Sequence, residues 1–130
     1  MPESKHYIKT VEESGSINIS EDVVAAIVAA ATSEVKGVHG LYYSAGKELS
    51  QAISKRGISR SVKLVIHEDD VHVDVYVLLA KDYSASDVGA DVQKSVMTAV
   101  EDSVGVKVSA VNVHICGVSL KSKPQPQPEK

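Results

Sequence analysis

The stretch VKLVIHEDDVHVDVYVLL, residues 62–79, decides the fold. Apolar side chains occupy every second position on both sides of an acidic break, which is the period of a half-buried β-strand. A two-residue turn at Asp69-Asp70 pairs Ile66 with Val73 and places the apolar side chains of both strands on one face. The same register sets His67 opposite His72. The stretch therefore predicts an antiparallel hairpin with one apolar and one polar face.

A segment with helical periodicity lies on each side of this hairpin. The first follows Ser20, a typical helix N-cap, and ends at Gly37. The second begins near Ser84 and ends at Gly105. Its valines recur every four residues, which is the stripe of an amphipathic helix: Val88, Val92, Val96, Val100 and Val104.

Shorter extended segments complete the pattern, at residues 16–19, 38–43 and 111–116. A strand, a helix and a further strand in succession imply a right-handed parallel crossover. We therefore predict an α+β fold of two layers, with a mixed β-sheet and two main helices on one face. The expected order is β-α-β-β-β-α-β.

The ends of the chain lack this patterning. Residues 1–14 are polar and predict a flexible N-terminal arm, and residues 120–130 are rich in Pro, Gln and Lys, which predicts a disordered tail. A single α+β domain is expected over residues 15–119. Residues 44–60 allow a short amphipathic helix, and the sequence leaves open whether they are helical or disordered.

Composition favours an ordinary intracellular domain. The chain has 130 residues, of which 43% are hydrophobic, and its single cysteine excludes an internal disulfide. No apolar run approaches the roughly 20 residues that span a bilayer. The first six residues lack the apolar centre of a signal peptide. These features predict a cytoplasmic protein without direct membrane insertion.

The basic residues gather in one segment, residues 47–63, although the formal net charge is −3. Lys55, Arg56 and Arg60 could contact phosphates, which makes nucleic-acid binding an alternative function. Stacking platforms are scarce, since the chain has five Tyr and no Phe or Trp. A solvated basic loop is the preferred interpretation, and these three residues are kept as part of a candidate interaction surface.

His67, His72 and Asp74 fall on the polar face of the predicted hairpin, and His114 joins them if the last strand is adjacent. Imidazole and carboxylate groups are ligands that suit zinc. The solvated face of a sheet often carries such residues without an ion, and no metal-binding motif supports a site here. We therefore assign His67, His72 and Asp74 to the interaction surface and expect no metal, while leaving open whether this face binds one.

No catalytic motif is complete. Gly46-Lys47 resembles the end of a phosphate-binding loop, but Leu41 and Glu48 stand where that loop needs glycine and Ser or Thr. Gly37 and Gly40 match a GxxG loop, although a helix cap followed by a bend explains them better. Cys116 has no recognisable base. We expect no enzymatic activity and no cofactor.

Taken together, four segments resemble the alkaline-shock-protein family of Gram-positive bacteria, which is also described as an envelope-stress-response family. They are Gly15–Ser20, Glu34–Gly40, Val71–Val77 and Val111–Val118, with Val92-Gln93 between the last two. The resemblance covers residues 15–118. Residues 44–61 and the Pro-Gln tail fit the pattern poorly, so nothing is transferred to them.

The resemblance implies an abundant cytoplasmic protein without an established enzymatic activity. It implies protein partners, which are a membrane-anchored protein in some members and a biotin-dependent carboxylase subunit of fatty-acid synthesis in others. We therefore expect a non-catalytic interaction protein in envelope stress homeostasis or in the regulation of fatty-acid and envelope metabolism, peripheral at the membrane through its partner. Exposed strand edges also favour self-association.

Overall fold

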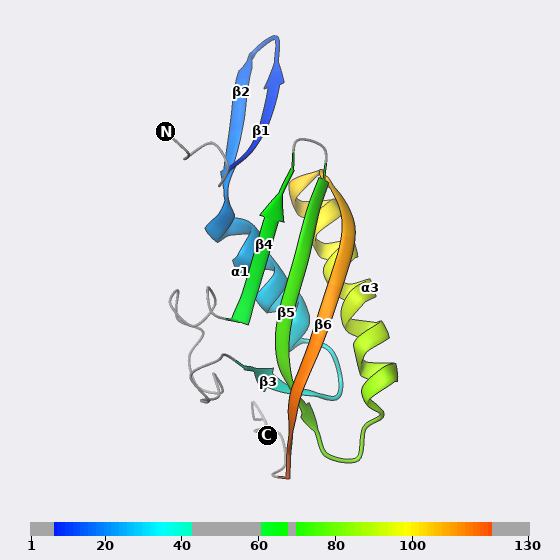
Figure 1. The fold of residues 1–130 in the computed structure, drawn as a ribbon. Helices are drawn as coiled ribbons and strands as arrows, with labels where there is room; N and C mark the ends of the chain where they lie inside the picture. The colour runs from blue at the N-terminus through cyan, green and yellow to red at the C-terminus, as the bar shows by residue number, and fades with distance from the viewer. Residues whose placement is uncertain (1–6, 43–60, 68–69, 121–130) are drawn as a thin grey trace, which may run out of the picture.

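The central strand of the sheet is β5, Asp70–Ala80, in a computed structural model that describes residues 7–42, 61–67 and 70–120. β6, Lys107–Ser119, pairs with β5 in parallel along one side. β4, Val62–Ile66, and β3, Val38–Leu41, pair antiparallel with successive parts of its other side. β3 and β4 therefore share one edge of the sheet, and β6 forms the opposite edge (Figure 1).

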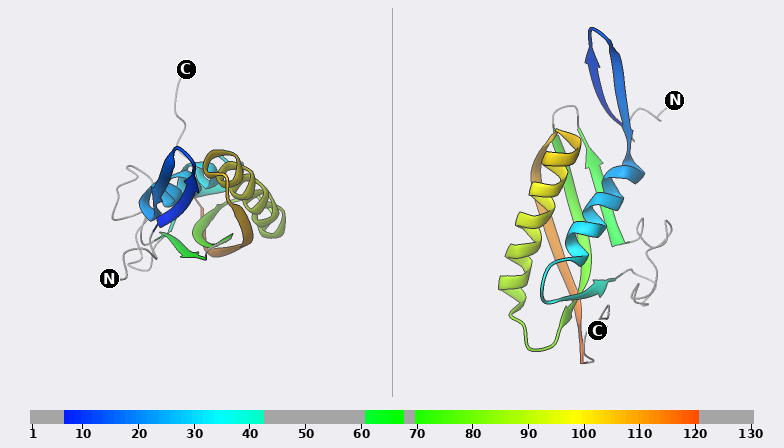
Figure 2. Two further views of the ribbon diagram at one scale, coloured as in Figure 1. Left: turned by 90° about the horizontal axis from the view of Figure 1, so that it is seen from above. Right: turned by 180° about the vertical axis from the view of Figure 1, so that it is seen from behind.

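Two helices, α1, Glu21–Ser33, and α3, Ala85–Val104, pack on one face of this sheet. Seen from behind, both helices lie in front of the strands (Figure 2). The predicted α+β class, the mixed sheet and the two helices on one face are confirmed. Over the described residues the order is β-β-α-β-β-β-α-β, because the structure adds one strand at the start of the predicted order.

The helix ends follow the capping residues expected from the sequence. The Ser20 hydroxyl accepts from the backbone N–H of Val23 at 3.4 Å, and the Ser84 hydroxyl accepts from that of Asp87 at 3.3 Å. Gly105 ends α3 in the left-handed conformation with a φ of 84°. Helix α1 ends at Ser33, earlier than the predicted stop at Gly37.

The core lies between the sheet and the helices and is built mainly from valine. Branched side chains of the strands pack against the valines that recur every four residues on α3, and against the inner face of α1. The largest of the fully buried side chains are Leu41, Val24, Val28, Val38, Val71, Val73, Val75, Val77, Val88, Val92, Val96 and Val100.

The hairpin register differs from the prediction by two residues. Ile66 lies opposite Val71 rather than Val73, and the backbone N–H of His67 donates to the carbonyl of Asp70 at 2.8 Å. Asp70 therefore begins β5 instead of occupying the turn, and Asp69 lies outside the described residues. The predicted apolar face survives because side chains alternate with a period of two, so periodicity alone cannot separate these registers.

The predicted flexible arm contains a strand. β1, Tyr7–Glu12, pairs antiparallel with β2, Gly15–Ser20, in a ribbon that extends beyond the end of the main sheet (Figure 1). Ile8 is buried at the base of this ribbon, whereas Val11 and Ile17 are 71% and 58% exposed. The short polar segment gives little periodic signal by itself, and it becomes a strand by pairing with β2.

Parts of three predictions lie outside the described residues. They are residues 1–6 of the predicted arm, the undecided segment 44–60 and residues 121–130 of the predicted tail. Within the described part of the chain, neither helix is both long and apolar enough to cross a membrane.

Candidate functional site

The face of the sheet away from the helices carries the polar side chains of the same strands. We call it the open face. In β5 the buried valines alternate with half-buried His72, Asp74 and Tyr76. The open face comprises Lys63, Val65, His67, Asp70, His72, Asp74, Tyr76, Asn112, His114 and Cys116.

One cluster on the open face joins β5 to β6. The Nε2 atom of His114 lies 3.0 Å from Oδ1 of Asp74, and the two side chains are 42% and 30% exposed. The Tyr76 ring stacks on the His114 ring with centroids 4.4 Å apart and an interplanar angle of 13°. The His114 imidazole is therefore in contact with both the carboxylate and the tyrosine ring. An ordered, half-exposed aromatic pair of this kind suits contact with a protein partner.

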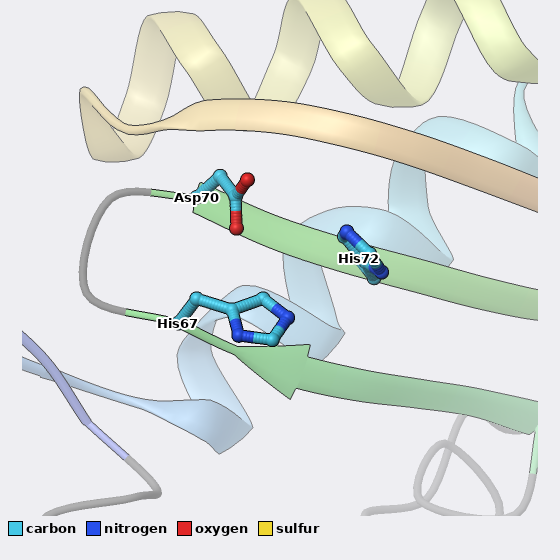
Figure 3. A group of neighbouring side chains, drawn as sticks. All are labelled: His67, Asp70 and His72. Carbon is cyan, nitrogen blue, oxygen red and sulfur yellow. The ribbon is translucent and has the colours of Figure 1, made fainter.

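A second cluster lies where β4 meets β5 (Figure 3). It contains His67, Asp70 and His72, whose candidate ligand atoms all lie within 4.8 Å of one another. The two imidazole rings meet edge to face with centroids 4.9 Å apart. His67 is exposed, while Asp70 and His72 are half-buried. Nitrogen and oxygen donors therefore converge at one point of the open face.

The structure divides the residues that the sequence had grouped as metal candidates. His67 and His72 do meet, although diagonally, because His72 lies opposite Val65 in the ladder. Asp74 belongs instead to the cluster with His114. Asp70 takes its place beside the two histidines, and sequence reasoning missed it because the expected register put it in the turn. The ladder register is the only signal that could have found it.

Lys55, Arg56 and Arg60 lie outside the described residues. The expected basic part of the interaction surface and its alternative role in nucleic-acid binding therefore stay predictions.

Cys116 also lies on the open face, where its Sγ donates to the carbonyl of His114 at 3.6 Å. Desolvation by partial burial raises the pKa of its thiol above the ordinary value. A raised pKa keeps the sulfur protonated at neutral pH, and the protonated thiol is a poor nucleophile. Catalytic cysteines usually have a lowered thiol pKa, so the pKa of Cys116 is shifted in the opposite direction.

The outer edge of β6 is a further candidate contact surface. Across the described residues, this 13-residue strand pairs only with β5. Val118 and Leu120, near its end, are 54% and 79% exposed. An unpaired edge presents backbone N–H and C=O groups that can bind an extended segment of another chain.

A groove between α1 and α3 has a volume of about 560 Å³. Its lining combines small side chains with charges of both signs, including Ala31, Glu34, Asp91, Lys94 and Ser95. The Ser95 hydroxyl donates to the carbonyl of Ala31 at 3.1 Å and so ties the two helices together across the groove floor. The groove is broadly open to solvent. Its shape differs from the enclosed apolar pockets that usually hold small ligands.

Comparisons with known proteins agree over most of the chain. Spy1535 of Streptococcus pyogenes serotype M6, an uncharacterized protein, is 36% identical and the match covers 90% of this chain and 89% of that protein. YloU of Bacillus subtilis, also uncharacterized, is 28% identical, with coverages of 82% and 90%.

Two solved variants of the MamM CTD are similar at 13% and 12% identity, with TM-scores of 0.47 and 0.46. These matches cover 75% and 78% of this chain and 94% and 87% of those chains. A family model matches residues 9–120, which include every described helix and strand except the first two residues of β1. The chain therefore belongs to the alkaline shock protein 23 family, described as having a cell envelope-related function.

Proposed function

We propose that this family member is a non-catalytic interaction protein that serves the cell envelope by binding other proteins. The observation that carries the proposal is the long outer edge of β6, which has no strand beside it among the described residues. Backbone groups on such an edge bind an extended peptide by adding it to the sheet as a further strand. A partner would therefore need an extended backbone segment that can pair with β6, and this mode of binding requires no chemical reaction.

The surroundings of the edge support this mode of binding. Val118 and Leu120 supply exposed apolar contacts near the end of β6. On the adjoining open face, Tyr76 and His114 form the stacked pair, and half-exposed aromatic side chains are frequent anchors of protein interfaces. Backbone pairing would supply affinity, and these side chains would supply selectivity.

A membrane-anchored protein is the partner that we propose first. The family is described as having a cell envelope-related function. The resemblance to alkaline shock proteins also implies a membrane-anchored partner in some members, and both points support this choice. Binding would hold the chain, as a cytoplasmic protein, peripherally at the membrane. A biotin-dependent carboxylase subunit and a second copy of this chain are the competing partners.

Affinity capture with matched variants tests the proposal. Val118→Lys places a charge on the β6 edge, whereas Val11→Lys changes a still more exposed valine on the distant β1–β2 ribbon. Edge lysines disfavour strand pairing. We expect the unaltered protein and Val11→Lys to capture one dominant membrane protein that Val118→Lys loses.

Each competing result is distinguishable in the same experiment. Enrichment of carboxylase subunits would replace the membrane partner, and light scattering of the purified protein would reveal self-association. Equal capture by both variants would contradict docking at the β6 edge. Material that nuclease or rising salt removes would favour the basic segment 47–63 and nucleic acid.

A further inference from the structure

We propose that His67, Asp70 and His72 form a binding site for a divalent transition-metal ion, with Zn²⁺ as the reference ion. The site lies on the open face, where β4 meets β5 (Figure 3). It is independent of docking at the β6 edge, so either proposal can fail without the other.

The donor set selects the class of ion. Two imidazole nitrogens and one carboxylate oxygen are the ligands that zinc and its transition-metal neighbours accept. Ca²⁺ and Mg²⁺ instead prefer sites made almost entirely of oxygen. The three side chains therefore favour Zn²⁺ over the common hard cations.

The distances are within reach of a zinc site. All three candidate ligand atoms lie within 4.8 Å of one another. Tetrahedral zinc with bonds of about 2.0–2.1 Å needs neighbouring ligand atoms about 3.3 Å apart. Rotation about side-chain bonds can close the difference, because His67 is exposed and the helices lie on the opposite face.

The backbone holds the three positions in place. The 2.8 Å hydrogen bond from the His67 N–H to the Asp70 carbonyl fixes the two residues across from each other. His72 follows Asp70 by two residues along β5 and therefore points to the same side of the sheet. Asp70 and His72 are carried on β5, and His67 directly follows β4. Ligands on strands are positioned more accurately than ligands on a loop.

The donors are also available. Within residues 7–42, 61–67 and 70–120, no hydrogen bond or ion pair engages the Asp70 carboxylate or the imidazoles of His67 and His72. The nearby pair differs, because Asp74 and His114 already bind each other at 3.0 Å. An ion bound by His67, Asp70 and His72 would have three protein ligands and an open position for water, as in zinc sites that exchange ligands.

Zinc titration of the full-length, tag-free and metal-stripped chain tests the site, with a chromophoric chelator as competitor. We expect one Zn²⁺ per chain, and NMR shifts in the imidazole signals of His67 and His72 rather than in those of His114. His72→Gln and Asp70→Asn should each weaken binding by about tenfold or more, since each removes one of three ligands. Mg²⁺ at the same concentration should leave the signals unmoved.

Two variants on the same face serve as matched controls. His114→Gln and Cys116→Ser should leave zinc affinity within about twofold, because neither residue belongs to the cluster. Thermal unfolding in the presence of chelator checks that all four variants fold alike. Undiminished binding by His72→Gln and Asp70→Asn would overturn the proposal, and so would loss of binding in either control.

Discussion

The two faces of the sheet are made from alternating residues of the same strands, yet one is apolar and buried and the other is polar and partly exposed. On the covered face Val73, Val75 and Val77 are fully buried against the helices. On the open face their neighbours in β5 carry an imidazole, a carboxylate and a phenol that remain half-exposed. Packing energy therefore comes mainly from the covered face, and the open face can carry polar groups because they stay in contact with water.

The largest effect should come from moving a charge between the faces. Val75→Asp buries a carboxylate where the native side chain is 0% exposed, and we expect a loss of at least about 4 kcal/mol, near the whole stability of a small domain. Tyr76→Asp, one residue along, should stay folded because its side chain points to the open face. Urea unfolding measures both, and similar losses would contradict the division between faces.

A glycine on the covered side should give the next largest effect. Gly37 has a φ of +96°, and a Cβ there would lie 2.5 Å from Cγ2 of Val88 and 2.8 Å from Cδ2 of Tyr83. Backbone strain and overpacking together predict that Gly37→Ala costs about 3 kcal/mol.

Gly89→Ala is the matched control for that substitution. An added Cβ at Gly89 meets no atom within 4 Å, and the residue lies inside α3. Its replacement by Ala should stabilise the protein by about 0.5–1 kcal/mol. Thermal unfolding of both variants compares their stabilities. An unchanged stability of Gly37→Ala would show that the Val88 and Tyr83 side chains can move away from the added Cβ.

Breaking the cluster that joins β5 to β6 should cost much less. Asp74→Asn alters the partly exposed 3.0 Å contact between Oδ1 of Asp74 and Nε2 of His114, and exposed contacts of this kind contribute at most about 1 kcal/mol. We expect little change in the urea midpoint, together with a broader or shifted imidazole signal for His114 in NMR spectra. A loss of unfolding free energy as large as that of Val75→Asp would show instead that the folded state depends on this cluster as it does on the core.

The smallest effect concerns reactivity rather than stability. Because partial burial raises the pKa of the Cys116 thiol, a smaller fraction is thiolate at neutral pH than in free cysteine. Alkylation by iodoacetamide should therefore be slower than that of free cysteine near pH 7 and should accelerate as the pH rises. Faster alkylation at pH 7 than for the free amino acid would contradict the expected protonation state.

Much of the fold could be predicted, because local rules and tertiary packing agree. Ser20, Ser84 and Gly105 cap the helices as their side chains and backbone freedom require. The valine stripe of α3 marks its buried side at the expected spacing. The candidate site was harder to predict from the sequence, because grouping His67 and His72 with the correct carboxylate needs the ladder register.

The sequence by itself determined the class of the fold, both helices and the division of the sheet into an apolar and a polar face, since each depends on spacing along one segment. Tertiary structure alone decided the hairpin register, the pairing of β1 with β2, and the separation of Asp70 from Asp74 into different clusters. The physical reason is that strands repeat every two residues, so registers two residues apart bury the same face. Only contacts between separate segments distinguish them, and those contacts place the polar groups on which the proposed site depends.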